Sequence, residues 1–318
     1  MGSKLRVMDV GEIEALKMVI PILPKGSLLD LGPGDDAAVL VVPDGRVVVS
    51  SDMMIEGPDF RFDWSDPHQV GYKAIASNAA DIAAMGATPT AFQLSVAVPP
   101  ETPIDTLVSM AQGFADGIKD LCPGASVTGG DLSNAPVVTV AVTVFGDLAG
   151  LTPVTRSSAT PGDLVCVAGE LGLSHRGLTE LLAWSENPAG NQKPDSRAIA
   201  HHLAPSPPIH LGPVAARAGA SAMMDISDGL VQDARRIAQA SGVVIRLDES
   251  LADDDHALFG GEDHGLLATF PKAVTPPEGF RVIGVVEQVV DTPGVVVQGR
   301  DLSTQRGGWD PFDETVAK

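Results

Sequence analysis

One recurring element organises this chain: strand ends and glycine turns that each carry an aspartate. In chain order they are Gly34-Asp35-Asp36, Ser50-Ser51-Asp52, Asp81 on an alanine-rich segment, Gly129-Gly130-Asp131, Asp225-Ile226-Ser227-Asp228-Gly229 and Gly260-Gly261-Glu262-Asp263. Carboxylates repel one another and are costly to bury without a partner. If these stretches converge in space, the fold has to place something cationic among them.

The charge of the whole chain narrows the choice of partner. With 41 acidic and 21 basic side chains the formal net charge is −20, and a solvated acidic surface explains part of it. Nucleic acids and anionic membranes require a basic patch, so neither is expected as a partner. Phosphate-bearing substrates remain compatible if metal ions bridge the two sets of negative charge. Mg²⁺ suits this role because it is typically held by a few carboxylates, waters and substrate phosphates. The acidic turns therefore predict Mg²⁺-dependent phosphoryl transfer.

The cysteines and the N-terminus bear on the compartment. Cys122 and Cys166 lie in apolar settings without a CxxC pair, which is typical of buried thiols in a reducing environment. Residues 1–5 lack the apolar core of a signal peptide, and no apolar run approaches the ~18–20 residues of a membrane span. We expect a cytoplasmic protein.

The first acidic turn precedes a predicted hairpin. Residues 37–42 and 47–51 are apolar runs on either side of Pro43-Asp44-Gly45, a strong turn signal. Antiparallel pairing of these runs would place Asp36 and Asp52 side by side at one end. Strand capping explains one such acid more easily than two, so the spacing favours a functional pair.

The alanine-rich segment begins with a helix-start signal, Asp66-Pro67, and predicts a helix over residues 67–85. Spacings of three and four place small and polar side chains on one narrow face: Ala74, Ser77, Asn78 and Asp81. Another element can approach such a face closely, and an aspartate on it needs a partner.

The remaining pattern alternates strands and helices in two halves. The first half predicts helices over residues 9–20 and 106–121, strands over 91–98 and 137–145, and a short strand over 125–128 that ends at Gly129-Gly130-Asp131. The pattern restarts near Gly150, so we predict domains at residues 1–150 and 151–318. The second half predicts strands over residues 164–168, 243–247 and 281–286, and a helix between Gly229 and Gly242.

Several other stretches resemble functional motifs. Ser227 or Asp228 could simply cap the helix that follows, or the helix N-terminus and its carboxylates could hold a metal–phosphate complex. Ser174-His175 lacks a GxSxG elbow and is not expected to be a nucleophile pair. His201, His202 and His210 have no acidic partner at ligand spacing in the sequence, so we expect surface or core histidines. No P-loop and no Rossmann GxGxxG is present.

Together these stretches resemble the thiamine-monophosphate kinase family. That family shares a superfamily with aminoimidazole ribonucleotide synthetase, selenophosphate synthetase and a hydrogenase maturation factor. The resemblance covers residues 30–312 and rests on the order and spacing of the acidic turns. Further matching pieces are Ile55-Glu56-Gly57, Lys73-Ala74, Ile82 to Ala87, Thr155-Arg156-Ser157 and Pro161-Gly162-Asp163.

The resemblance implies an α/β (α+β) chain with a two-domain PurM-like fold. The N-terminal domain would bind ATP and Mg²⁺ and pair into a dimeric β-barrel, giving a homodimer, and the C-terminal domain would be α/β. By match to the family pattern, several Mg²⁺ ions would be held by Asp36, Ser50, Ser51, Asp52, Asp81, Asp131, Asp225 and Asp228. ATP would contact Gly130, Asp131, Arg156 and Ser227.

The resemblance also implies thiamine monophosphate as the acceptor, near Asp59, Glu262 and Trp309. The acceptor is a phosphate monoester, mostly ionised near pH 7, so no residue is expected to act as a general base. Asp59 stands where the family usually has a histidine, and His264-Gly265 replaces a commoner Tyr-Glu. Two alternatives therefore remain: an ATP- and Mg²⁺-dependent enzyme with another acceptor, and a non-catalytic dimer that binds a nucleotide or a thiamine phosphate. Trp309 could pack on the protein body or stack on a flat ligand.

Overall fold

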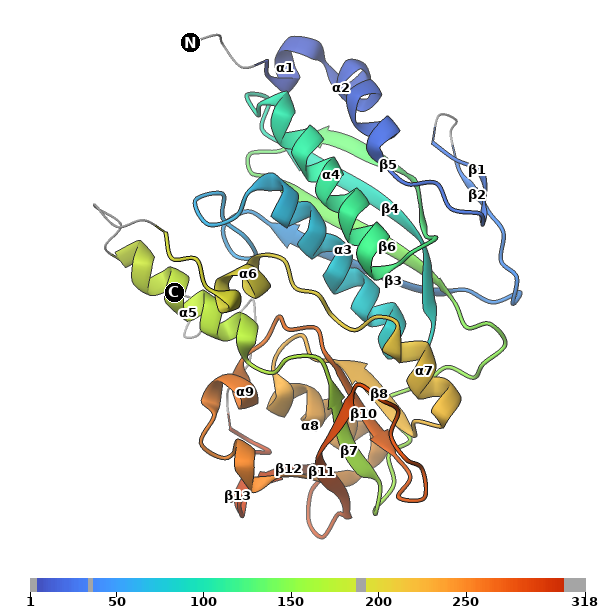
Figure 1. Cartoon of the computed structure of the whole chain (residues 1–318), viewed down its shortest axis with the longest axis vertical. Helices are drawn as coiled ribbons and strands as arrows, with labels where there is room; N and C mark the ends of the chain where they lie inside the picture. The colour runs from blue at the N-terminus through green and yellow to red at the C-terminus, as the bar shows by residue number, and fades with distance from the viewer. Residues whose placement is uncertain (1–4, 34–36, 187–192, 306–318) are drawn as a thin grey trace. The chain divides into compact units, whose positions relative to one another are not determined.

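The computed structural model of this chain describes residues 5–33, 37–186 and 193–305 (Figure 1). It contains two compact units. The first comprises Met1–Ile82 and Thr88–Ala149, and the second comprises Ala83–Ala87 and Gly150–Lys318. Each unit combines a β-sheet with helices. Within the described ranges, no helix has both the length and the apolar character needed to cross a membrane.

A four-stranded sheet forms the centre of the first unit. Its strands in spatial order are β3 (Val48–Ile55), β6 (Thr139–Asp147), β4 (Thr88–Val98) and β5 (Ser126–Asn134). β6 is antiparallel to both of its neighbours, and β5 runs parallel to β4. On β6, Val140, Val142 and Val144 are at most 1% exposed, whereas the residues between them are half-buried. One face of the sheet therefore packs on the core and the other is more open.

Two long helices, α3 (Pro67–Ala84) and α4 (Ile104–Leu121), lie along one face of this sheet (Figure 1). The predicted start of α3 is confirmed by a reciprocal cap. Asp66 Oδ1 accepts a hydrogen bond from the Gln69 N–H at 2.8 Å, and Gln69 Oε1 accepts one from the Asp66 N–H at 3.0 Å. This pair satisfies two donors that the first helical turn leaves free.

Glycines set the distance between these two helices. A Cβ atom on Gly71 would lie 2.2 Å from the Met110 carbonyl oxygen, and one on Gly113 would lie 2.0 Å from the His68 carbonyl oxygen. Both distances are far inside van der Waals contact, so only glycine permits this backbone approach. The small-residue face predicted for the alanine-rich helix serves the same purpose toward the sheet.

Shorter elements complete the first unit. They are α1 (Val7–Val10), α2 (Glu12–Val19), the 3-10 helix η1 (Ile20–Ile22), β1 (Leu29–Leu31) and β2 (Val39–Leu40). The single helix expected over residues 9–20 is thus divided at Gly11, whose φ of +77° does not continue a helix.

The predicted hairpin between residues 37–42 and 47–51 is wrong. The turn itself exists, since the Gly45 N–H donates to the Val42 carbonyl at 3.1 Å. The flanking strands pair elsewhere, β2 with β1 and β3 with β6. β3 pairs with β6 over eight residues and packs beside the buried valines of that strand. β2 has only two residues and could form far fewer hydrogen bonds with β3. The spacing of the two runs therefore gives no reason to expect Asp36 beside Asp52.

The predicted strand at residues 125–128 does not end at the two glycines. β5 continues through them and through Asp131. The pairing with β4 skips one residue of β5, Thr128, because its register passes from Phe92↔Val127 to Gln93↔Gly129. This is a β-bulge, and it shifts the inward–outward alternation of every later residue by one. The two glycines therefore lie within an irregular strand and not in a turn.

A seven-stranded sheet forms the centre of the second unit. Its spatial order is β13 (Arg300–Asp301), β12 (Gly294–Val297), β9 (Val243–Leu247), β11 (Phe280–Gln288), β7 (Leu164–Ala168), β10 (Leu266–Phe270) and β8 (Ala222–Asp225). All neighbours are antiparallel except β12 and β9. The three strands predicted for this half are confirmed, and the last is longer than expected.

The helices of the second unit are α5 (Leu173–Glu186), α6 (Arg197–Leu203), α7 (Leu211–Ala218), α8 (Leu230–Ser241), α9 (Asp255–Phe259) and the 3-10 helix η2 (Glu249–Leu251). α8 contributes the centre of the core through Leu230, Ala234 and Ile237, which are fully buried against apolar strand residues. This burial fixes the start of α8, and with it the loop that joins β8 to α8.

Candidate functional site

The first group of predicted site residues lies where β3 packs on α3. Ser50 Oγ donates a hydrogen bond to Asp81 Oδ2 at 2.6 Å, and the Asp52 N–H donates to Asn78 Oδ1 at 3.1 Å. Ser50 and Asp52 are two residues apart on a strand, so they share the face that meets α3. The group offers two carboxylates and a hydroxyl from rigid elements. Asn78, which aligns β3, was not predicted as a site residue, although it lies on the small-residue face identified from the sequence.

Asp131 lies at the opposite edge of the same sheet. Asp52 on β3 pairs with Val142, and Asp131 on β5 pairs with Ser95. Three strand spacings, together roughly 14 Å, separate the two edges. Paired residues point to the same face of a sheet. Asp52 therefore shares the helix-covered face with Val142, whereas Asp131 shares the open face with Ser95 and Ala141. Asp52 and Asp131 of one chain consequently differ in edge and in face, and they cannot bind the same ion.

Two further predicted residues are engaged by local partners. Ser51 Oγ donates to the Val142 carbonyl at 3.0 Å and lies 3.2 Å from Thr143 Oγ1. Asp59 Oδ2 accepts a hydrogen bond from the Ile55 N–H at 2.7 Å. This bond closes the turn after β3 and gives the aspartate a structural role at the position where the family usually has a histidine.

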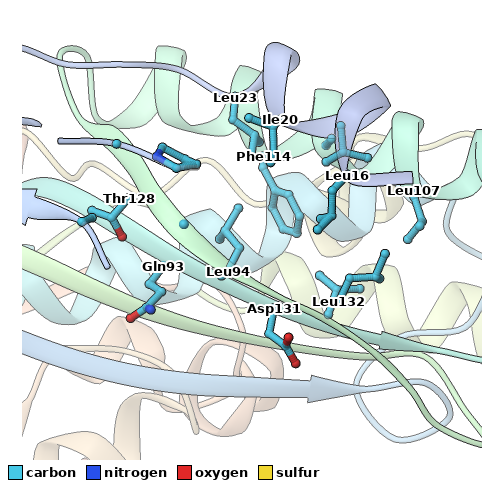
Figure 2. A pocket seen from close by; sticks show the side chains of 18 of the residues that line it. Leu16, Ile20, Leu23, Gln93, Leu94, Leu107, Phe114, Thr128, Asp131 and Leu132 are labelled. Atoms are coloured by element: carbon cyan, nitrogen blue, oxygen red, sulfur yellow. The ribbon is translucent and has the colours of Figure 1, made fainter. Parts of the chain in front are cut away.

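A cavity of about 340 Å³ opens beside the two glycines of β5 (Figure 2). Apolar side chains of α2, η1 and α4, among them Leu16, Ile20 and Phe114, line one side. Residues of β4 and β5, among them Leu94 and Gly130, line the other side. An apolar chamber with a few polar groups at its border is the usual form of a small-molecule site.

Two features tie this cavity to the acidic turns. Pro33 and Ala37, which flank the first acidic turn, both line it. Gly130 lies in its wall, and a Cβ atom there would lie 1.5 Å from the Leu94 carbonyl oxygen. Any larger residue would push β5 away from β4. Asp36 itself lies outside the described residues.

The second unit brings its two acidic stretches together through backbone hydrogen bonds. The Glu262 N–H donates to the Ser227 carbonyl at 2.8 Å, and the His264 N–H donates to the Ile226 carbonyl at 3.0 Å. A Cβ atom on Gly261 would lie 2.4 Å from the Ser227 oxygen, so a glycine is needed for this contact. The pairing gathers four predicted site residues at the C-terminal end of β8 and in the loops next to it: Asp225, Ser227, Asp228 and Glu262.

An arginine that was not predicted from the sequence joins this group. The guanidinium of Arg236 contacts Asp228 through one nitrogen and Asp233 through another. Asp233 Oδ2 also accepts from the N–H groups of Asp228 and Gly229 at 3.1 and 3.2 Å. Burial, and then the negative charge of Asp225, raises the pKa of Asp233 to about 7, while Arg236 lowers it. Arg236 thus compensates carboxylates that would otherwise repel one another.

The same contacts decide how α8 begins. Its N-cap residue is Gly229, which has no side chain, and Asp233 supplies the capping carboxylate from inside the helix. The interpretation of Ser227 or Asp228 as a simple cap is therefore wrong. Both side chains are half-buried and remain at the surface of the loop. Their position suits contact with a ligand.

Several histidines have acidic partners that sequence spacing did not reveal. His201 Nε2 lies 3.2 Å from Asp263 Oδ1, and His202 Nδ1 lies 3.3 Å from Glu262 Oε2. The expectation of surface or core histidines agrees with the structure, in which His202 is buried and His210 is exposed, and the acidic partners are about 60 positions away in the chain. His264 Nδ1 likewise lies 3.3 Å from Asp225 Oδ2.

Ser174 belongs to the same buried network and does not pair with His175. Its Oγ lies 2.9 Å from His202 Nδ1, and its N–H donates to Asp263 Oδ1 at 2.8 Å. The side chain of Ser174 is completely buried. The prediction that Ser174-His175 is not a nucleophile pair therefore agrees with the geometry.

Arg156, predicted to contact ATP, lies beside β8. Arg156 is exposed, and the preceding residue, Thr155, accepts a hydrogen bond from the Met223 N–H at 3.2 Å. Arg156 is thus held alongside β8, two residues before the acidic end of that strand. Trp309 lies outside the described residues.

The donor chemistry fits Mg²⁺ bound partly by a substrate. In the described part of the chain, no three His, Cys, Asp or Glu side chains converge closely enough to hold a metal by themselves. The groups present are carboxylate and hydroxyl oxygens, the ligand type that Mg²⁺ prefers. Mg²⁺ commonly uses one or two carboxylates and completes its shell with water and phosphate oxygens. Small, separate acidic groups such as Ser50–Asp81 meet that requirement.

Comparisons with known proteins agree with this chemistry. The family model of the AIR synthase related protein, N-terminal domain, matches residues 34–148, and that of the C-terminal domain matches residues 160–289. The thiamine-monophosphate kinase of Mycobacterium tuberculosis is 40% identical over 327 residues, covering 97% of this chain and 93% of the relative. That of Corynebacterium glutamicum is 38% identical over 334 residues, covering 96% and 95%. A solved structure of AaThiL complexed with AMPPCP and TMP has a TM-score of 0.73 at 28% identity, covering 97% of this chain and 99% of that one.

The Arg236 network yields a prediction for the metal-free protein. Arg236→Gln should destabilise the fold by about 1–3 kcal/mol, because it leaves buried Asp233 without its charged partner. Asp228→Asn should cost less in the Arg236→Gln background than in the parent chain, giving a coupling free energy of about 1 kcal/mol. Urea unfolding of the four chains in the presence of a chelator measures this coupling.

The exposed pair Arg246–Glu287 is the matched control, because its geometry is similar but both side chains face solvent. Its coupling should be clearly smaller, since water and salt screen such pairs. Equal coupling in the two cycles would show that Arg236 is an ordinary surface partner.

Proposed function

Since this chain belongs to the thiamine-monophosphate kinase family of AIR synthase related proteins, we propose that it transfers the γ-phosphoryl group of ATP to thiamine monophosphate, forming thiamine diphosphate and ADP. The family and the mixed α/β two-domain fold expected from the acidic turns are confirmed. AMPPCP is an ATP analogue, so the AaThiL complex supports ATP as the phosphoryl donor.

The observation that carries the proposal is the set of separate oxygen-donor groups on rigid elements. Ser50 with Asp81 offers a hydroxyl and a carboxylate, and the end of β8 with the loop after it offers the carboxylates of Asp225 and Asp228. Transfer between two phosphates needs positioning and charge neutralisation more than covalent chemistry. Mg²⁺, when bound, supplies that neutralisation and aligns the two anions.

Residues of both units are assigned to metal-ion contacts. In the first unit, Asp81 accepts the Ser50 hydroxyl hydrogen, which leaves lone pairs on Ser50 Oγ free for a cation. We assign Ser51, Asp52 and Asp131 to further ion contacts, with Asp36 from the first acidic turn. In the second unit, Asp225 is held by His264 and Asp228 by Arg236, so both carboxylates have defined orientations before any ion binds. No general base is assigned, because the acceptor phosphate is already ionised near pH 7.

ATP is assigned to the cavity beside β5. Its apolar lining suits a nucleobase, and its volume of about 340 Å³ is within the range of small-molecule sites. Gly130 lies in its wall, where any side chain would force β5 away from β4, and Asp131 is the next residue of that strand. Arg156 and Ser227 are assigned to phosphate contacts, for which an exposed guanidinium and a loop hydroxyl are suited.

The acceptor is assigned to Glu262 and Trp309. Glu262 has a φ of +64°, a costly conformation for a residue with a side chain, which is held by backbone bonding to the 226–227 loop. Its carboxylate and the face of Trp309 both attract the fixed positive charge of a thiazolium ring. Asp59 is assigned near the same end, where its bond to Ile55 turns it toward its own loop.

We assign a homodimer on the basis of the open sheet face in the first unit. β3 and β5 are the edges of a sheet that is not closed by the described strands. Val49, Met53 and Ile55 lie on the open face and are 57%, 53% and 37% exposed. Exposed apolar rows and free edges favour pairing with a second copy, which would form a barrel. The pairing would also bring Asp131 of one copy near the β3 edge of another.

The first test is the reaction itself. Purified protein with ATP and Mg²⁺ should form thiamine diphosphate from thiamine monophosphate and not from thiamine, because only the monophosphate offers an ionised phosphate nucleophile. Removal of Mg²⁺ with a chelator should abolish turnover. Thiamine diphosphate and ADP are both quantified by chromatography. Absence of product with ATP still bound would favour the alternative of another acceptor, to which the Asp59 and His264 replacements point.

The acidic groups are tested by Asp52→Asn and Asp131→Asn. Each should lower kcat by about 100-fold or more, corresponding to about 2.7 kcal/mol, because each removes charge where two anions meet. The unfolding temperature of the metal-free protein should stay nearly constant, because both side chains are exposed. Asp120→Asn, at an exposed position near the end of α4, is the control. Near-normal activity of both variants at limiting Mg²⁺ would make the acidic groups structural.

The nucleotide cavity is tested by filling it. Ala111 of α4 lines the cavity, whereas Ala115, one turn later on the same helix, does not. Ala111→Leu should raise KM for ATP about tenfold, equivalent to about 1.4 kcal/mol, and leave KM for thiamine monophosphate nearly unchanged. Ala115→Leu should change neither constant. A rise in KM for the thiamine substrate alone would assign the cavity to the acceptor.

A further inference from the structure

His175 and His256 form a close pair outside the acidic groups assigned to the reaction. His175 lies in the first turn of α5 and His256 lies in α9, 81 positions later, yet their Nδ1 atoms are 3.1 Å apart. Their ring centroids are 4.9 Å apart, with an angle of 56° between the planes. Both side chains are half-buried, so an ion from solvent can reach them.

Two imidazole nitrogens at this distance are compatible with two arrangements. One neutral ring can donate a hydrogen bond to the other, or both lone pairs can bind one metal ion. In a tetrahedral site with metal–nitrogen bonds of about 2.0–2.1 Å, two ligand nitrogens lie about 3.3 Å apart. The observed separation differs from this value by a few tenths of an ångström. Small rotations of the two rings are therefore enough to accept a metal.

The charges around the pair favour a bound cation. Arg176 of α5 is the nearby positive group, and Asp254 at the start of α9 neutralises it through contacts of 2.7 and 2.8 Å. Asp263, from the acidic loop after α9, adds a negative charge that raises the pKa of His175. Burial and His256 lower that pKa by more, so His175 is neutral at pH 7 and able to act as a ligand.

We propose that His175 and His256 together bind a divalent transition-metal ion of the Zn²⁺, Co²⁺ or Ni²⁺ class, with water completing its coordination. Imidazole nitrogen suits these ions and not Mg²⁺, which prefers oxygen. The site is therefore chemically distinct from the oxygen-donor groups assigned to phosphoryl transfer. Because its two ligands come from α5 and α9, a bound ion cross-links two elements of the second unit.

The experiment is a Co²⁺ titration of the full-length, tag-free chain in an excess of Mg²⁺, followed by visible absorption, with Zn²⁺ competition. One ion per chain should bind, and Zn²⁺ should displace Co²⁺. His175→Gln and His256→Gln should each weaken binding at least tenfold, whereas His210→Gln, at an exposed site at the start of α7, should not. Zn²⁺ should raise the unfolding temperature of the parent chain and of His210→Gln only.

The outcomes separate this site from the proposed reaction, because metal binding is measured without substrates. Binding that persists unchanged in both folded pair variants would overturn the proposal, as would the absence of binding in the parent chain. Circular dichroism establishes folding of each variant. The two substitutions lie on different helices, so one folded variant is enough to decide. Loss of binding in His210→Gln as well would contradict a specific site.

Discussion

Repulsion between carboxylates is the constraint on which this structure depends. Within the described residues, Asp81, Asp225 and Asp228 of the predicted site each contact a hydroxyl, a histidine or an arginine. In the first unit a hydroxyl is the donor, since Ser50 Oγ donates to Asp81. In the second unit a full positive charge is used, since Arg236 lies between Asp228 and Asp233. Both solutions give the carboxylates of Asp81 and Asp228 a defined orientation before any cation binds.

Local signals in the sequence predicted those elements whose causes are themselves local. The start of α3 follows from Asp66 and Gln69, which cap one turn of helix, and β7 follows from one apolar run between turns. The family resemblance, carried by the spacing of the acidic turns, indicated the two-domain fold. The predictions that are wrong concern elements whose pairing partners are distant in the sequence. The hairpin after the first acidic turn failed because β3 pairs with β6, about 90 positions away, and nothing near β3 indicates that preference.

The candidate site shows the same division. The acidic residues could be found from the sequence because glycines and neighbouring acids mark them. Their supports could not, since nothing local in the sequence links Asn78, Arg236 or His264 to the acidic residue that each contacts in the fold. Arg236 lies eight positions after Asp228, across a loop and two helical turns, where no short motif links the two. The contact of His202 with Glu262 likewise depends on how the 260–264 loop lies against its neighbours.

Because of the bulge at Thr128, the face to which Asp131 points depends on the number of residues in β5 as well as on their identities. Because one residue is skipped in pairing with β4, Asp131 points to the open face of the sheet together with Ser95. Deleting a single residue upstream of the two glycines would keep every motif intact and yet turn the aspartate to the opposite face. Insertion or deletion of one residue in this strand reverses the face to which Asp131 points, whereas a change of two residues restores it. Selection should therefore act against length changes by an odd number of residues. Related chains should therefore tolerate substitution at Thr128 far more readily than its loss.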